Sequence, residues 1–205
     1  MKKVVLLVSS LTLAGLSSSA LANGIYLGAA YNNQKLSPKE ADAGSFSVKT
    51  VDLVAGYQVN QYFSVEVSFV VSSNDDLSEE KDANFSNQEY VDIDSQWSLK
   101  AKGTYPVTDA FSVFAYASYV DTEIKSEVIR FPLNENGATT GTPSRGTFAF
   151  SDSGVGFGLG AQYNFNENWA LYVDYSLHPD FEIKGDDSSA KIDHDSFSFG
   201  VTYKF

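Results

Sequence analysis

The last nine residues restrict the fold of this chain more than any other segment. Apolar and aromatic side chains stand at every second position there, with Ser, Gly, Thr and Lys residues between them. The apolar set is Phe197, Phe199, Val201, Tyr203 and Phe205. Successive side chains of a β-strand point to opposite faces, so this segment predicts a strand with one apolar and one polar face.

The N-terminal segment predicts export. The chain begins with the basic Met1-Lys2-Lys3, continues through mostly apolar residues 4–16 and then carries the small-x-small sequence Ala20-Leu21-Ala22. These are the parts of a secretory signal peptide, so we expect residues 1–22 to be cleaved and residues 23–205 to form one domain. The rest of the chain has no unbroken apolar run of about 18 residues, so no transmembrane helix is expected.

Charge and cysteine content exclude several classes of function. The sequence has 14 basic and 26 acidic residues, for a formal net charge of −12. Such an acidic chain is poorly suited to binding phosphate backbones, so no nucleic-acid partner is expected. It contains no cysteine, which excludes disulfides and thiolate chemistry. No cofactor is expected either.

Eight segments alternate in the way expected of strands. They cover residues 24–32, 47–59, 63–72, 90–105, 110–122, 151–165, 169–177 and 197–205. In the fifth segment Phe114 and Tyr116 stand opposite the apolar face. The sixth segment has glycine at positions 154, 156, 158 and 160, which would leave room for these two rings to point inward.

The connections between these segments alternate between short and long. Residues 60–61, 106–109 and 166–168 form short turns, whereas the other four connections are longer and polar. An even number of strands with this alternation is typical of transmembrane β-barrels, which have short periplasmic turns and longer extracellular loops.

With its terminal Phe205, the chain resembles the small outer-membrane β-barrels of Gram-negative bacteria, a family that includes the OmpA membrane domain, OmpX and opacity-type surface proteins. The resemblance implies an all-β, eight-stranded, antiparallel up-and-down barrel in the outer membrane. It also implies that the terminal alternating residues 197–205 are an assembly signal for the barrel-assembly machinery. Contacts with outer-membrane lipid and lipopolysaccharide, and a monomeric state, follow from the same resemblance.

Charged side chains opposite the apolar faces are predicted to line the lumen. An eight-stranded barrel is just wide enough for side chains to fill, so buried charges there must pair or take up water. Glu66 can meet Lys100 or Lys102 from an adjacent strand, and Asp174 can meet Lys204. These pairs form either a rigid plug or a gate for small ions. The full set is Asp52, Glu66, Asp92, Asp94, Lys100, Lys102, Asp174 and Lys204.

Aromatic residues gather near the predicted strand ends. Tyr and Trp favour the headgroup level of a membrane, where the ring is buried and the polar tip stays wet. We therefore expect an aromatic girdle made of Tyr31, Tyr57, Phe63, Trp97, Tyr105 and Trp169.

One motif raises the possibility of catalysis. His194-Asp-Ser196 resembles the His-x-Ser pair of outer-membrane lipid A deacylases, which act at the membrane-facing surface. Here no acidic residue follows Ser196, and both side chains share the polar face of the last strand. We therefore predict no enzyme activity and interpret His194 and His178 as loop residues.

These observations predict a non-enzymatic integral outer-membrane protein. It would support envelope integrity and present surface loops for adhesion or for other host and surface ligands. The longest predicted loop, residues 125–147, carries Ile129, Phe131 and Leu133 around Pro132 and could form a projecting hairpin. A narrow, porin-like channel for ions or small solutes is the first alternative, and a lipid-modifying enzyme is the second.

Overall fold

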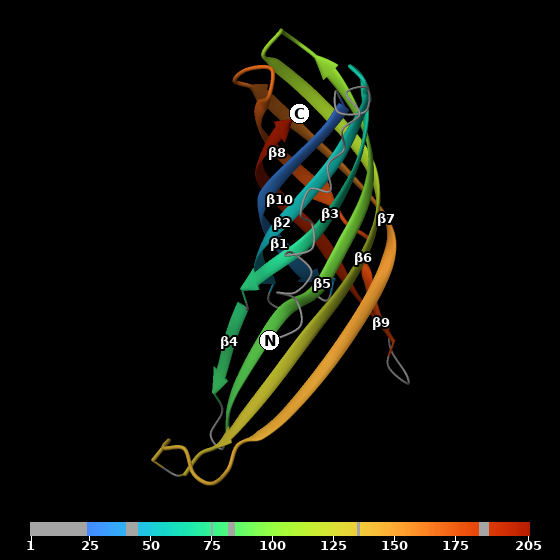
Figure 1. The fold of residues 1–205 in the computed structure, drawn as a ribbon. Coiled ribbons are helices and arrows are strands. Elements are labelled where there is room, and N and C mark those ends of the chain that lie inside the picture. Colours follow the sequence, from blue (N-terminus) through green and yellow to red (C-terminus); the bar gives the residue numbers. More distant parts are fainter. Residues whose placement is uncertain (1–23, 40–44, 75, 82–84, 135, 185–188) are drawn as a thin grey trace, which may run out of the picture.

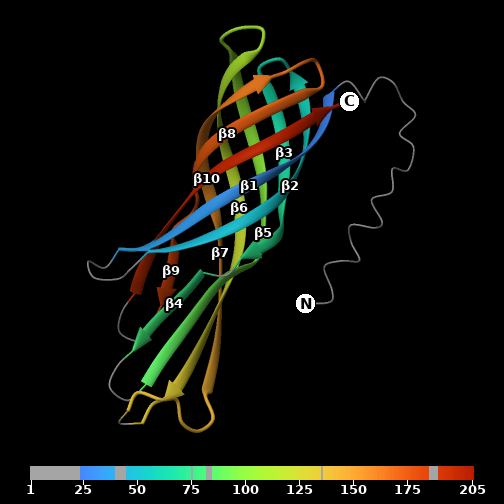
Figure 2. The ribbon, with the colours of Figure 1, turned by 90° about the vertical axis from the view of Figure 1, so that its left-hand side faces the viewer.

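The computed structural model describes residues 24–39, 45–74, 76–81, 85–134, 136–184 and 189–205, so the predicted signal peptide lies outside the described residues. No helix among the described residues is long and apolar enough to cross a membrane. The strands (Figures 1 and 2) are β1 (Ile25–Pro38), β2 (Phe46–Asn60), β3 (Phe63–Asn74), β4 (Asp76–Lys81), β5 (Phe85–Pro106), β6 (Phe111–Pro132), β7 (Ser144–Asn164), β8 (Trp169–Leu177), β9 (Phe181–Lys184) and β10 (Ser189–Lys204).

Eight of these strands close into a ring. The order is β1-β2-β3-β5-β6-β7-β8-β10, and β10 returns to pair with β1 from Tyr26↔Lys204 to Pro38↔Ile192. Every pairing in the ring is antiparallel, while β4 and β9 add short pairings to β5 and β10. The predicted eight-stranded antiparallel up-and-down barrel is confirmed.

Short turns and long connections lie at opposite ends of the barrel. The turns β2–β3, β5–β6 and β7–β8 and the C-terminus share one end, here called the turn end. Asparagine side chains hold two of these turns: Asn60 Oδ1 accepts from the Tyr62 amide at 2.8 Å, and Asn166 Oδ1 accepts from the Asn168 amide at 2.9 Å. The opposite end, with the long connections, is called the loop end.

The two faces of the wall reverse the usual distribution of polarity. On the outer face Leu159 is 65% exposed and Leu177 is 54% exposed, whereas on the inner face Ser98 is only 4% exposed. A barrel in water hides its large apolar side chains. An apolar outer band around a polar interior is the arrangement of a barrel whose outer solvent is lipid.

The glycines of β7 leave space for two inward rings, as predicted. Phe114 and Tyr116 on β6 are buried inside the barrel. A Cβ atom at Gly158 would lie 2.2 Å from Tyr116 Cζ, and one at Gly160 would lie 2.5 Å from Phe114 Cζ. The two rings therefore occupy the space that side chains on this face of β7 would otherwise fill.

Several strands are longer at the loop end than the sequence predicts. β5 and β6 each contain 22 residues and β7 contains 21, so much of the predicted loop 125–147 is strand. The predicted hairpin exists, with β6 and β7 paired out to Arg130↔Ser144. Residues 85–93, 124–132 and 144–150 are called the loop-end extension (Figure 1). Strand segments that project beyond the membrane do not need an apolar side chain at every second position. The alternation of apolar and polar residues in the sequence therefore did not reveal them.

The predicted orientation of Asp92 and Asp94 is wrong. The register of β5 shifts between Ile93 and Ser95, which leaves Asp94 as one extra residue in a β-bulge. The bulge reverses the faces beyond it, so Val91 and Ile93 are buried inside. Asp94 lies outside and pairs with Lys125 at 2.5 Å, with both side chains well exposed.

Candidate functional site

The lumen contains a buried charge pair nearest the turn end. Glu66 on β3 forms an ion pair with Lys102 on β5, and the Tyr26 hydroxyl donates to Glu66 Oε1 at 2.6 Å. The Lys102 ammonium also lies 5.4 Å from the Tyr26 ring centroid and 5.1 Å from that of Phe114. Of the two predicted partners for Glu66, Lys102 forms the ion pair, although Lys100 is its direct neighbour in the register.

The predicted pair between Asp174 and Lys204 does not form. Asp174 accepts from the Tyr116 hydroxyl at 2.6 Å and from Ser176 Oγ at 3.1 Å. Lys204 donates to Gln58 Oε1 at 2.8 Å instead. In the register Asp174 lies opposite Ser198, six positions from Lys204, so the stagger between the strands keeps the two charges apart.

Two further charged residues line the middle of the lumen. Thr50 Oγ1 donates to Asp52 Oδ1 at 3.2 Å. The Lys100 ammonium lies 4.8 Å from the Tyr116 ring centroid. A narrow cavity of about 20 Å³ touches Asp52, Lys100 and Tyr116. A cavity needs about 10–15 Å³ of such volume to hold a water molecule, so this one has room for about one.

A layer of neutral polar side chains crosses the lumen above these charges. Gln34 Nε2 donates to Gln96 Oε1 at 2.8 Å, and Gln96 Nε2 donates to Thr122 Oγ1 at 2.8 Å. His194 Nε2 lies 2.7 Å from Gln34 Oε1. Sequence reasoning missed this layer because Gln34 lies beyond the predicted end of the first strand. The continued alternation of Asn32, Gln34 and Leu36 on one face was the available signal.

The interpretation of His194 as a loop residue is wrong, because it lies within β10, whereas His178 does lie in the connection directly after β8. His194 is 2% exposed on the inner face of β10, and its ring stacks on that of His178 with centroids 4.2 Å apart. Ser196 Oγ lies 2.9 Å from His178 Nε2, so the Ser–His contact involves His178 rather than His194. His178 Nδ1 has no hydrogen-bond partner among the described residues. An orienting carboxylate is therefore missing, and Ser196 faces the lumen rather than the lipid.

The lumen widens toward the turn end. A cavity of about 460 Å³ opens there, and its lining includes Tyr26, Lys102 and Lys204. The Glu66–Lys102 pair thus lies at the inner limit of a wide vestibule. In the middle of the lumen, beyond this pair, the described side chains line the narrow cavity of about 20 Å³.

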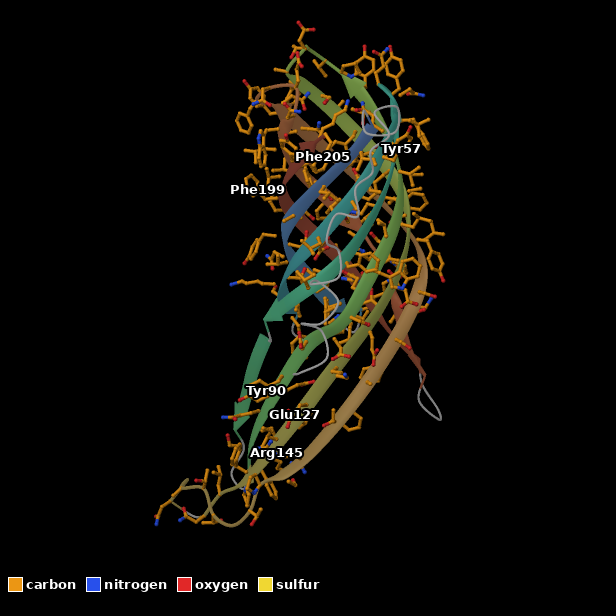
Figure 3. The ribbon with its side chains drawn as sticks, viewed as in Figure 1. Tyr57, Tyr90, Glu127, Arg145, Phe199 and Phe205 are labelled. Atoms are coloured by element: carbon orange, nitrogen blue, oxygen red, sulfur yellow. The ribbon has the colours of Figure 1, made fainter. Side chains whose placement is uncertain are left out.

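The outer face carries the predicted aromatic residues. All six are exposed, and Figure 3 shows Tyr57 near the turn end together with Phe205. Trp97 lies nearer the loop end, where its ring centroid is 5.8 Å from that of Tyr119. The exposed positions are Tyr31, Tyr57, Phe63, Trp97, Tyr105 and Trp169. Of the terminal alternating residues, Phe197, Phe199 and Phe205 are the most exposed.

The loop end presents a polar outer surface. Lys39 Nζ lies 2.8 Å from Asp180 and 2.7 Å from Asp193, and its hydrogen bonds to these carboxylates raise the pKa of Lys39. On the loop-end extension Arg145 Nη1 lies 3.4 Å from Glu127 Oε1 (Figure 3). The Arg145–Glu127 contact thus lies on the loop-end extension, whereas the Lys39 contacts join the ends of β1 and β10 and the connection after β8.

Comparisons with known proteins agree with this architecture. A family model for the outer membrane protein beta-barrel domain matches residues 4–205. Neisserial surface protein A shares 17% identity and a TM-score of 0.52, over 89% of this chain and 97% of that chain. Ail of Yersinia pestis, solved with the heparin analogue sucrose octasulfate, shares 14% identity and a TM-score of 0.50, over 89% and 99%. No curated protein matches significantly. At these identities the likeness concerns the fold alone.

Proposed function

The chain belongs to the outer membrane protein beta-barrel family, and we propose that this member is a closed, non-enzymatic barrel that supports the envelope and presents its loop-end extension to external ligands. The observation that carries the proposal is the narrow middle of the lumen, where the cavity between the described side chains measures only about 20 Å³. A lumen this narrow favours a contribution through the wall and the external surface over transport.

The buried charges support the plug rather than the gate. Glu66 already has Lys102 and Tyr26 as partners, and Asp174 already has Tyr116 and Ser176. Breaking one such buried pair to let an ion pass would leave a charge without a partner, which costs about 3–5 kcal/mol. Partner exchange at that cost is too rare to sustain conduction.

Lipid contacts belong to the same proposal. Lys35 and Lys49 are exposed on the outer face, beyond the apolar band that includes Tyr31 and Val51. Cations at this level suit the phosphates of lipopolysaccharide. We also propose that residues 197–205 act as the assembly signal and that the signal peptide is cleaved after Ala22.

A planar bilayer recording tests the closed lumen. We expect purified mature protein, shown to be folded by its heat-modifiable gel mobility, to produce no discrete current steps at low protein dose. The physical reason is that hydrogen-bonded side chains cross the lumen at Glu66 and at the Gln34–Gln96 layer, with a cavity of only about 20 Å³ between the described side chains in the middle of the lumen. Reproducible steps whose size changes in Glu66→Ala would contradict the proposal and assign the protein to the narrow channels.

Truncation of the extension tests the binding surface. Residues 129–145 are replaced by Asn-Gly, which joins the paired residues Val128 and Gly146 by a two-residue hairpin turn. We expect adhesion of cells expressing this variant to host-cell or matrix surfaces to fall to background. Gel mobility should stay unchanged, because the ring pairings below the cut, starting at Glu89↔Val128 and Val128↔Gly146, remain.

The matched control for the truncation changes the opposite end of the barrel. Glu167 is exposed in the turn between β7 and β8, so Glu167→Ala should leave adhesion unchanged. Full adhesion by the truncated variant would show that the ligand surface lies elsewhere. Because the chain has a net charge of −12, we expect a neutral or basic ligand surface, unlike the polyanion named for Ail.

A further inference from the structure

The inner face of the barrel changes from polar to apolar at the loop end. Up to the Gln34–Gln96 layer the inward side chains are mostly Ser, Thr, Asn and Gln. Beyond that layer, inward residues from four strands form a buried apolar cluster, here called the apolar floor. Its members are Leu36, Val48, Val91, Ile93 and Ile124.

An unfilled pocket lies directly above this floor. It has a volume of about 270 Å³, and its walls include Val128, Phe148 and Phe150 from the loop-end extension. Phe148 remains 54% exposed although it lies on the inward side of β7. The described side chains therefore build an apolar pocket without filling it.

A purely structural role explains the floor but not the pocket. Packing the floor joins β1, β2, β5 and β6 above the polar layer and needs no open space. The exposed ring of Phe148 beside this floor keeps apolar surface in contact with water, and an apolar ligand would remove that surface from water. An enclosed apolar cavity of about 150 Å³ already accepts benzene, so a pocket of about 270 Å³ is large enough for one or two aromatic rings.

One polar group is placed in the wall of the pocket. Glu89 lines it, and Ser126 Oγ donates to Glu89 Oε1 at 3.0 Å. A carboxylate accepts hydrogen bonds only, so a ligand must supply the donor. The hydrogen bond from Ser126 holds one carboxylate oxygen of Glu89 and orients the carboxylate in the wall of the apolar pocket. This is the usual composition of a small-molecule pocket.

We propose that this pocket binds a small neutral aromatic molecule of one or two rings that carries a single N–H or O–H donor. The rings lie on the apolar floor against Phe148 and Phe150, and the donor meets Glu89. The closed polar layer beneath the floor makes this a binding site rather than an entrance to a channel. The inference goes beyond the proposed function, because ligand binding here requires neither adhesion nor transport.

Indole is a suitable probe, since it has two fused rings and one N–H. Its binding to the folded full barrel in detergent micelles is measured by isothermal titration calorimetry, with protein-free micelles as the reference for partitioning. We expect saturable binding that weakens about tenfold in Phe148→Asn, because half of the ring wall is lost. Phe165→Asn is the matched control: Phe165 is 57% exposed but lies in a turn at the opposite end, so affinity should not change.

Naphthalene separates the donor contact from apolar burial. Glu89→Leu should weaken indole binding about tenfold while leaving naphthalene binding unchanged or stronger. Ser126→Phe, which fills the pocket, should abolish binding of both. Binding no greater than micelle partitioning, or equal affinity in wild type and Phe148→Asn, would overturn the proposal. Equal weakening of both probes in Glu89→Leu would overturn the assignment of the donor.

Discussion

Replacing Glu66 by alanine is expected to lower the free energy of unfolding by about 3–5 kcal/mol. The substitution leaves Lys102 without its counter-charge and the Tyr26 hydroxyl without its acceptor, and the side chains of the ion pair are about nine-tenths buried at the inner limit of the vestibule. The measurement is reversible urea unfolding in phospholipid vesicles. Tryptophan fluorescence from Trp97 and Trp169 reports the transition, since both side chains face outward.

A double-mutant cycle isolates the pair. Lys102→Met removes the other charge, and the double variant Glu66→Ala with Lys102→Met should be more stable than the sum of the single losses predicts. Glu127→Ala is the matched control, because Glu127 pairs with Arg145 on the exposed surface. Its cost should stay below about 1 kcal/mol. Equal costs for Glu66→Ala and Glu127→Ala would show that the lumen pair is solvated and that the plug is not tight.

Replacing Gly160 by alanine is expected to destabilise the barrel by about 3 kcal/mol or to prevent its assembly. A Cβ atom there would lie 2.3 Å from the carbonyl oxygen of Val173 and 2.5 Å from Phe114 Cζ. The carbonyl oxygen of Val173 belongs to the backbone of the adjacent strand β8. The strands β7 and β8 must therefore move apart slightly to admit the new methyl group. The measurements are the folded fraction by gel mobility and the urea midpoint.

Paired substitutions distinguish a backbone clash from a side-chain clash. At Gly158 the three nearest atoms all belong to the Tyr116 side chain, so Tyr116→Ala should relieve part of the cost of Gly158→Ala. Phe114→Ala should not rescue Gly160→Ala, because the carbonyl of Val173 remains. Gly103→Ala is the control, since its nearest neighbour would lie 3.9 Å away. Full tolerance of Gly160→Ala would mean that β7 and β8 pack less closely than described.

The stacked histidines show what the alternation of side chains along one strand can predict and what it cannot. His194 and Ser196 were correctly assigned to the polar face of the last strand from parity alone. Their burial and the contact with His178 required the three-dimensional structure, because His178 lies sixteen residues earlier, directly after β8. The same holds for the Gln34–Gln96 amide pair, whose members are 62 residues apart.

The number of strands in the ring, the outward face of most of them and the three short turns can all be predicted from the amino-acid sequence. These depend on a two-residue period and on local turn chemistry, both of which are present in any short window. Lipid strengthens the signal, since it requires an apolar residue at each outward position of the membrane band. The inward orientation of Phe114 and Tyr116 followed from the same period.

The contacts between side chains, and the structure beyond the membrane band, depend on how the strands pair in the folded chain. The stagger around the closed ring is a property of all eight strands together, and it pairs Glu66 with Lys102 while separating Asp174 from Lys204. The single extra residue at Asp94 exchanges the inward and outward faces of β5 beyond the bulge, so Val91 points inward. The apolar pocket depends on that reversal, so only the strand pairing, which no local sequence pattern specifies, could reveal it.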